Sequence, residues 1–230
     1  MTVPMLVSFA LAAGFLSLPN RAGAQEFADR YRAYQEHVTA GRAALHQSNF
    51  TIAIDHLTQA IEMSPFESSH YFDRGLAWYK TGHYENAMED FNKVIILDPR
   101  RSAAYVYRGL CQMNRGEYHG ALSDYTTALS RNPEDATVHN NLAWLYATAE
   151  DEKFRDKAKA LEHAERAAAL SKEGNAEILD TLARAYFVNG KMQEAVDAEN
   201  RALKLDPENG EFKEHLRIYE EVLASSGSRH

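Results

Sequence analysis

The sequence predicts an all-α fold, an α-solenoid of helix-turn-helix repeats, and three observations predict it. First, the segment GHYENAMEDFNKVIILDPR (residues 82–100) is followed thirty-four residues later by GEYHGALSDYTTALSRNPE (residues 116–134). Second, apolar residues in both segments recur at spacings of three and four, the period of a helix face. Third, a proline near the end of each segment stops its second helix. One hairpin cannot bury its apolar face alone, whereas stacked hairpins can.

Five copies of this template account for most of the chain. They are residues 34–67, 68–101, 102–135, 136–175 and 176–209. Small residues at template positions 8, 20 and 27 let the two helices of a hairpin approach closely. Glycine or serine near position 15 permits the tight turn between them. The fourth copy carries six extra residues, mostly between its two helices.

The segments on either side of the repeats continue the helical pattern. Residues 25–33 lead into the first helix and extend it backwards. Residues 210–223 place Phe212, Tyr219 and other apolar residues at helical spacing, which predicts a helix that caps the last apolar face. Residues 224–230 are expected to form a flexible tail.

This pattern resembles the tetratricopeptide repeat family, because the copies agree at several template positions each. The resemblance implies a right-handed superhelix of helix pairs with a concave groove lined by the first helix of each pair. In that family, positions 2, 5, 9, 12 and 13 of the first helix tend to face the groove. Carried onto this chain, they predict a partner-binding groove of Phe72, Leu76, Tyr79, Lys80, Val106, Leu110, Met113, Asn114, Asn140 and Trp144. The alternative is that several of these side chains pack against the neighbouring repeat as core.

Some members of the family grip a partner's C-terminal carboxylate with a Lys/Asn/Arg set at positions 2, 5, 6 and 9. In the first copy these positions are Gln35, Val38, Thr39 and Arg42. The next two copies have Ser69, Phe72, Asp73, Leu76, Ala103, Val106, Tyr107 and Leu110 there. The family's carboxylate clamp is therefore not expected in this chain.

The first 24 residues have the features of a secretory signal peptide. An apolar run from Met5 to Leu18 is broken by Pro19 and followed by Ala22-Gly23-Ala24, a small-x-small cleavage site. The run is short for a bilayer of about 30 Å. We therefore expect cleavage after Ala24 and a periplasmic or secreted protein. Retention of the segment as an anchor is the alternative, because the stretch before Arg21 carries no charged side chain.

Several kinds of chemistry find no support in the sequence. The net charge of −8 argues against a nucleic-acid binder, which needs a basic face. No nucleophile elbow, phosphate loop or H-E-x-x-H motif is present. The ten histidines are scattered, so no metal site is predicted, although a site assembled from separate repeats is left open. Cys111 occupies a small apolar position, which predicts a buried, inert thiol.

The leading hypothesis is a non-enzymatic adaptor or scaffold that binds a protein or peptide through its groove. It needs no cofactor, no nucleic acid and no membrane beyond the export signal. The alternative is a structural subunit of an envelope or homo-oligomeric assembly. Such superhelices serve many unrelated processes, so the repeat alone does not choose between these functions.

Overall fold

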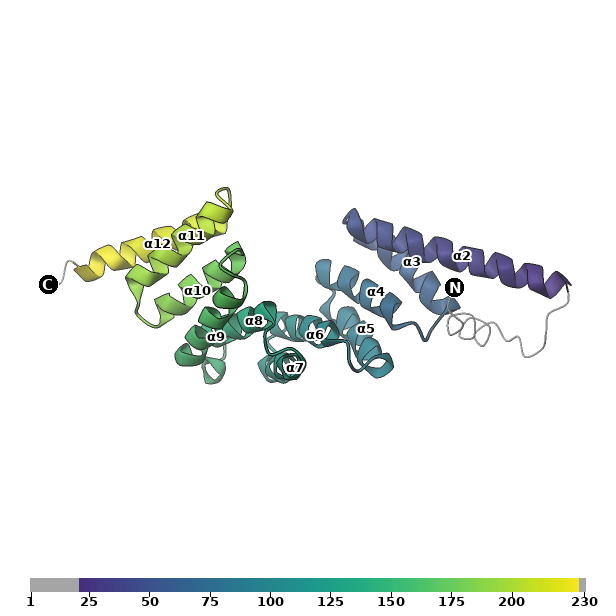
Figure 1. The fold of residues 1–230 in the computed structure, drawn as a ribbon, viewed down its shortest axis with the longest axis horizontal. Coiled ribbons are helices and arrows are strands. Elements are labelled where there is room, and N and C mark those ends of the chain that lie inside the picture. Colours follow the sequence, from purple (N-terminus) through teal and green to yellow (C-terminus); the bar gives the residue numbers. More distant parts are fainter. Residues whose placement is uncertain (1–20, 228–230) are drawn as a thin grey trace. The chain divides into compact units, whose positions relative to one another are not determined.

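The computed structural model describes residues 21–227, and within that range it contains helices and no strands (Figure 1). The all-α prediction is therefore confirmed. In chain order the elements are α2 (Arg21–His46), α3 (Phe50–Met63), α4 (Ser68–Lys80), α5 (Tyr84–Leu97), α6 (Ser102–Asn114), α7 (Tyr118–Arg131), α8 (Ala136–Thr148), the 3₁₀ turn η1 (Glu152–Phe154), α9 (Lys157–Leu170), α10 (Ala176–Val188), α11 (Met192–Leu205) and α12 (Gly210–Gly227). Among these helices, none combines the length and the apolar character that crossing a bilayer requires. The chain divides into two compact units, and the boundary between them in the sequence falls within α6, after Cys111.

The N-terminal unit is built from helix pairs in which α2 packs on α3, α4 packs on α5, and α3 joins the two pairs. Small residues make the close approach possible, as the template predicts. A Cβ atom at Gly75 would lie only 2.9 Å from Cε1 of Phe91, whose ring is fully buried. The aromatic rings of Phe72 and Tyr107 pack against Phe91 with centroids 5.8 and 5.7 Å away. This unit therefore has a core of its own.

The C-terminal unit repeats the same construction. Helix α8 packs on α9, α10 on α11, and α12 covers the exposed side of α11. Phe212 and Tyr219 of α12 are buried in the core, and the rings of Tyr219 and Phe187 lie 4.8 Å apart. Helix α12 continues to Gly227, past the boundary expected at residue 223. It buries the apolar face that α11 would otherwise expose.

The turns inside the hairpins use the left-handed backbone conformation. Gly82, Gly116 and Gly190 have φ between 73° and 76°, and Ser48 takes φ 59° at the same template position. Only glycine adopts this region without a steric cost from Cβ. The template thus predicted these turns correctly, including the one in which serine replaces glycine.

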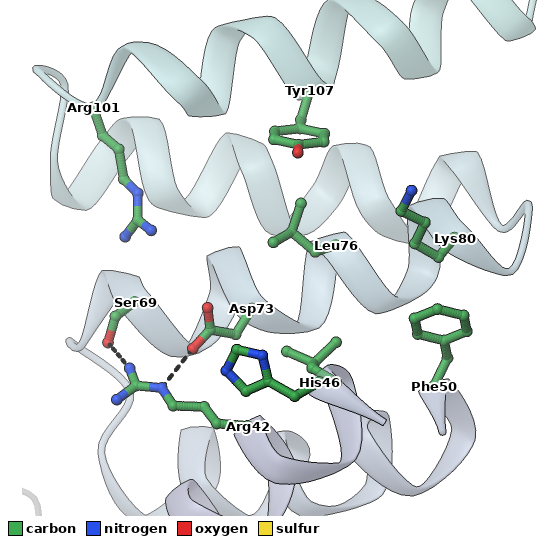
Figure 2. Close-up of a pocket in the computed structure, with 10 residues that line it drawn as sticks. Arg42, His46, Phe50, Ser69, Asp73, Leu76, Lys80, Arg101 and Tyr107 are labelled. Carbon is green, nitrogen blue, oxygen red and sulfur yellow. Dashed lines mark hydrogen bonds and ion pairs between the residues drawn. The ribbon is translucent and has the colours of Figure 1, made fainter. Parts of the chain in front are cut away.

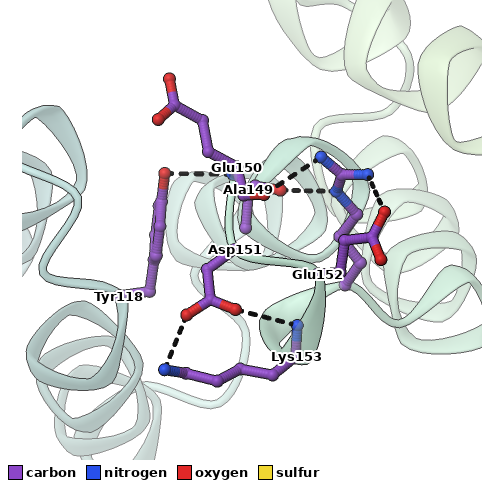
Figure 3. Close-up of polar contacts among 7 residues, drawn as sticks. Tyr118, Ala149, Glu150, Asp151, Glu152 and Lys153 are labelled. Carbon is purple, nitrogen blue, oxygen red and sulfur yellow. Dashed lines mark hydrogen bonds and ion pairs between the residues drawn. The ribbon is translucent and has the colours of Figure 1, made fainter.

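The extra residues of the fourth repeat form an ordered loop around η1 (Figure 3). Tyr118 of α7 accepts the backbone N–H of Glu150 on its hydroxyl at 3.1 Å, and its ring packs against Phe154. Arg155 donates from Nε to the carbonyl of Ala149 at 2.5 Å and from Nη2 to the carbonyl of Glu150 at 3.3 Å. The insertion is therefore held in place by polar contacts to its own backbone and to α7.

The N-terminal prediction falls largely on residues 1–20, which lie outside the described residues. Helix α2 begins at Arg21, so residues 25–33 are part of its first turns. Signal-peptide cleavage after Ala24 stays a prediction.

Candidate functional site

The N-terminal unit contains a cavity of about 460 Å³ between its first helices (Figure 2). Its walls combine apolar and charged side chains. They are Arg42, Leu45, His46, Phe50, Ser69, Asp73, Leu76, Lys80, Arg101 and Tyr107. This volume lies within the range of about 300–1,000 Å³ that is usual for small-ligand pockets.

Helical spacing brings the lining residues onto one face of each helix. Arg42, Leu45 and His46 lie at i, i+3 and i+4 on α2. The lining residues of α4 also share one helix face, because they recur at spacings of four, three and four: Ser69, Asp73, Leu76 and Lys80. Tyr107 of α6 and Arg101, directly before α6, complete the walls, with Phe50 from the start of α3.

The polar contacts of the cavity centre on Arg42. Its Nε donates to Oδ2 of Asp73 at 2.8 Å, and its Nη2 donates to Oγ of Ser69 at 3.3 Å (Figure 2). The Arg42 side chain is about half exposed, so this pair is worth no more than about 1 kcal/mol. The contacts nevertheless tie α2 to α4 and fix the direction of the guanidinium.

A second cation lies on the other side of the cavity. The guanidinium carbon of Arg101 stands 3.8 Å from the centroid of the Phe72 ring, a cation–π contact that orients it. Lys80 is exposed at the end of α4. With Arg42, the cavity has three permanent cations and one carboxylate, Asp73, in a chain whose net charge is −8. It can therefore attract an anionic group while its apolar wall contacts aliphatic side chains.

The ten residues predicted for the groove take different places. Leu76 and Lys80 line the cavity, whereas Phe72 and Val106 are buried in the core. Tyr79 packs its ring against Tyr84 and Tyr107, and Leu110 is half-buried. The remaining four belong to the C-terminal unit: Met113, Asn114, Asn140 and Trp144. Whether the ten act together on a partner stays a prediction.

Sequence reasoning missed most of the cavity. Besides Leu76, four of the lining residues occupy template positions at which the family's carboxylate clamp was sought: Arg42, Ser69, Asp73 and Tyr107. Arg101 and Phe50 stand outside those positions. No local signal marks them, because their approach depends on how neighbouring hairpins pack.

Comparison with known families gives a clear match. A family model described as "Tetratricopeptide repeat" matches residues 38–102 and 151–210, and a second model with the same description matches residues 102–135. No curated protein matches the chain.

Solved structures with the same arrangement of helices are numerous. A thermophilic TPR protein from Thermus thermophilus is similar with a TM-score of 0.65 at 20% identity, over 81% of this chain and 98% of that one. MamA (residues 41 to the end) from Desulfovibrio magneticus gives 0.64 at 18% identity, over 77% and 97%. A chain of the APC/C hetero-tetramer Cut9–Hcn1 gives 0.73 at 17% identity, over 85% of this chain and 38% of that one. At these identities the likeness shows the fold alone.

Proposed function

Because the chain belongs to the tetratricopeptide repeat family, we propose that it is a protein-binding scaffold whose N-terminal unit takes an acidic group of a partner into the cavity. The acidic group is an Asp or Glu side chain or a C-terminal carboxylate. The aliphatic residues beside it contact Leu45, Leu76 and Phe50. The observation that carries the proposal is the convergence of Arg42, Lys80 and Arg101 on one cavity with an apolar wall. No catalytic activity or cofactor is part of the proposal.

Two features support an anionic ligand. Arg42 and Arg101 are both oriented by other contacts, with Asp73 and Ser69 in the first case and with the Phe72 ring in the second. A cation that is already oriented loses less entropy when it binds a carboxylate. Guanidinium groups also bind carboxylates in a bidentate manner, which gives direction as well as affinity. The sequence predicted an apolar groove, whereas the proposed site has both apolar and cationic walls. Burial of apolar surface supplies affinity, and the cations orient the bound acidic group.

The test uses an array of short peptides that carry an acidic residue or a free C-terminus next to aliphatic residues. Each peptide is paired with its amide counterpart, in which Gln or a C-terminal amide replaces the acid. We expect wild-type chain to prefer the acidic member of the pair by about tenfold, and the preference to fall as salt rises. Arg101→Glu should abolish the preference for the acidic peptide. Leu76→Glu should weaken the binding of both peptides in each pair.

Arg100→Glu is the matched control, because it makes the same charge change one residue away on an exposed side chain that does not line the cavity. Circular dichroism confirms that each variant is folded. Equal binding of acidic and amide peptides by wild type would refute the role of the cations. Unchanged binding by folded Leu76→Glu would reject the cavity as the binding surface.

We also propose that the chain is exported and acts in the periplasm. The support is the apolar run from Met5 to Leu18 and the cleavage site at Ala22-Gly23-Ala24. N-terminal sequencing of the protein from a periplasmic fraction tests this. A first residue of Gln25 is expected, and a first residue of Met1 would contradict cleavage.

A structural subunit of an envelope or homo-oligomeric assembly is the second candidate function. Large apolar side chains that do not line the cavity are exposed in the N-terminal unit, among them Phe66 and Ile96 at 65% and 72%. Such side chains can mediate self-association. Light scattering after size exclusion separates the two candidates, since a monomer favours the adaptor. A defined oligomer that Ile96→Glu dissociates favours the structural role.

A further inference from the structure

The last helical hairpin and the capping helix enclose a cluster of ionisable side chains that the cavity does not use. Asp180 lies on α10, Glu199 on α11 and His215 on α12. One ligand atom from each lies within 4.8 Å of the others. Nδ1 of His215 and Oδ1 of Asp180 are 2.6 Å apart, although the two residues are 35 positions apart in the sequence.

Burial sets this cluster apart from an ordinary group of surface acids. Glu199 is 0% exposed and Asp180 is 8% exposed. No N–H group among the described residues donates to either carboxylate oxygen of Glu199, and the group that these oxygens face is the carboxyl of Asp180. A buried carboxylate without a counter-charge is strongly disfavoured, so buried acids are normally paired or bound to a metal.

The first three hairpins of the chain have apolar residues at the template positions that these two acids occupy. Glu199 stands at template position 24, where the earlier hairpins bury Leu57, Phe91 and Tyr125 without any exposure. Asp180 stands at position 5, where the first three hairpins have Val38, Phe72 and Val106. Both apolar partners of a normal hairpin core are thus replaced by acids that face each other.

The neighbouring basic group, Arg184, donates to neither carboxylate among the described residues. Arg184 directs Nη2 at Nε2 of His215, 3.4 Å away, and its Nε has no partner among the described residues. The arrangement therefore favours a bound cation between the two acids.

We propose that Asp180, Glu199 and His215 bind one divalent metal ion of the zinc class. Two carboxylate oxygens and one imidazole nitrogen are a ligand set that Zn²⁺ accepts, with a fourth position left for water. Zinc bonds are about 2.0–2.2 Å long, so binding requires the ligand atoms, now within 4.8 Å of one another, to lie no more than about 4.4 Å apart. The ion would join α10, α11 and α12 and neutralise both carboxylates.

The experiment titrates the full chain, freed of metal with a chelator, with Zn²⁺ and separately with Mg²⁺ by isothermal titration calorimetry. We expect one Zn²⁺ per chain, a rise in melting temperature on loading, and much weaker Mg²⁺ binding, because Mg²⁺ prefers oxygen ligands and keeps its waters. Glu199→Gln keeps the side-chain shape and removes the charge. It should weaken Zn²⁺ binding by about 100-fold or more, beyond the 10–100-fold typical of an outer-shell partner.

Two controls locate the site. Glu194→Gln changes an exposed acid on the same helix. His163→Gln removes a different imidazole pair of this unit, in which Nδ1 of His163 lies 2.8 Å from Nδ1 of His139. Neither should alter the affinity for Zn²⁺. His215→Gln, at a half-buried position, is the second site variant if Glu199→Gln fails to fold. The proposal is overturned if the chain binds no stoichiometric Zn²⁺, if Mg²⁺ binds as tightly, or if binding survives in the site variants and is lost in His163→Gln.

Discussion

At the scale of single residues, backbone conformation explains why the template tolerates so few residue types in its turns. Ser48 has φ 59° and Gly82 has φ 76°, and the same hydrogen bond closes both turns. The N–H of Asn49 bonds the carbonyl of Ala44 at 2.8 Å, and the N–H of His83 bonds that of Trp78 at 2.9 Å. The turn of the first hairpin therefore keeps its geometry, although serine there carries the steric cost of a Cβ in the left-handed region.

Exchanging the two residue types tests this interpretation. Ser48→Gly should stabilise the chain by about 0.5–1 kcal/mol, since glycine removes the strain but gains freedom in the unfolded chain. Gly82→Ser should destabilise it by about 1 kcal/mol, because a Cβ there meets nothing within 4 Å and only the backbone is strained. Urea unfolding followed by circular dichroism measures both. Gln47→Gly, outside the left-handed position, is the control and should not stabilise.

The thiol of Cys111 gives a second prediction at this scale. Cys111 is 0% exposed, and burial raises its pKa to about 12. The thiolate is the reactive form, so a thiol reagent at about pH 8 should not label the native chain within minutes, whereas an ordinary cysteine would react. Labelling should become complete in concentrated urea. Fast labelling of the native chain would contradict an inert core position.

At the scale of elements, the insertion of the fourth repeat shows how a departure from the template is stabilised. Arg155 holds the end of α8 by donating to the carbonyls of Ala149 and Glu150, and Ala149 is 1% exposed. Lys153 instead pairs with Asp151 at 2.6 Å on the surface, where both side chains are largely exposed. Of the two basic residues in this loop, Arg155 therefore holds the backbone in place, whereas Lys153 makes only a surface ion pair.

Removing each charge separates these roles. Arg155→Met should destabilise the chain by about 1–2 kcal/mol, because it leaves the carbonyl of the buried Ala149 without its Arg155 donor. Lys153→Met should change stability by no more than about 0.5 kcal/mol, as is usual for an exposed ion pair. Urea midpoints of the two variants provide the comparison. Equal small effects would mean that the loop does not depend on the Arg155 contacts.

The sequence was most informative about the secondary-structure elements. Glycine or serine near position 15, proline at position 32 and the three-and-four spacing predicted four of the hairpins, because these signals are local. The fourth copy, residues 136–175, lacks the glycine and the proline and was predicted from its apolar and alanine spacing alone. Leu76 and Lys80 of the cavity followed from their helix face. Arg101 and Phe50 did not, since a residue beside a helix end meets the cavity only through tertiary packing. The acids at positions 5 and 24 of the last hairpin were visible in the sequence, but their convergence with His215 required α12 to be placed on α11.

At the scale of the whole molecule, each unit contains a histidine that should make it sensitive to acid, His70 buried in the N-terminal unit and His163 half-buried in the C-terminal unit. His70 is 1% exposed and shares a 2.8 Å hydrogen bond with the hydroxyl of Tyr34. Burial holds the pKa of His70 below its ordinary 6.5. In the C-terminal unit, burial and then His139 lower the pKa of His163 in the same way. In both cases the folded chain binds fewer protons than the unfolded chain near and below pH 6.5, so the stabilising contribution is complete above 6.5 and is lost as pH falls.

The two tryptophans allow this to be measured in each unit, because Trp78 lies in the N-terminal unit and Trp144 in the C-terminal unit. Single-tryptophan variants are unfolded in urea at several values between about pH 5 and 8, the range in which histidine titrates. The stability difference between the parent and His70→Gln, reported by Trp78, should shrink as pH falls, and the same holds for His163→Gln reported by Trp144. The difference between parent and variant is used instead of the stability of the parent alone. Other buried groups, Glu199 among them, change the stability with pH in the opposite direction. His119→Gln, on the exposed side of α7, should leave the pH dependence unchanged. A difference that is constant across the range would mean that neither imidazole is held neutral by the fold.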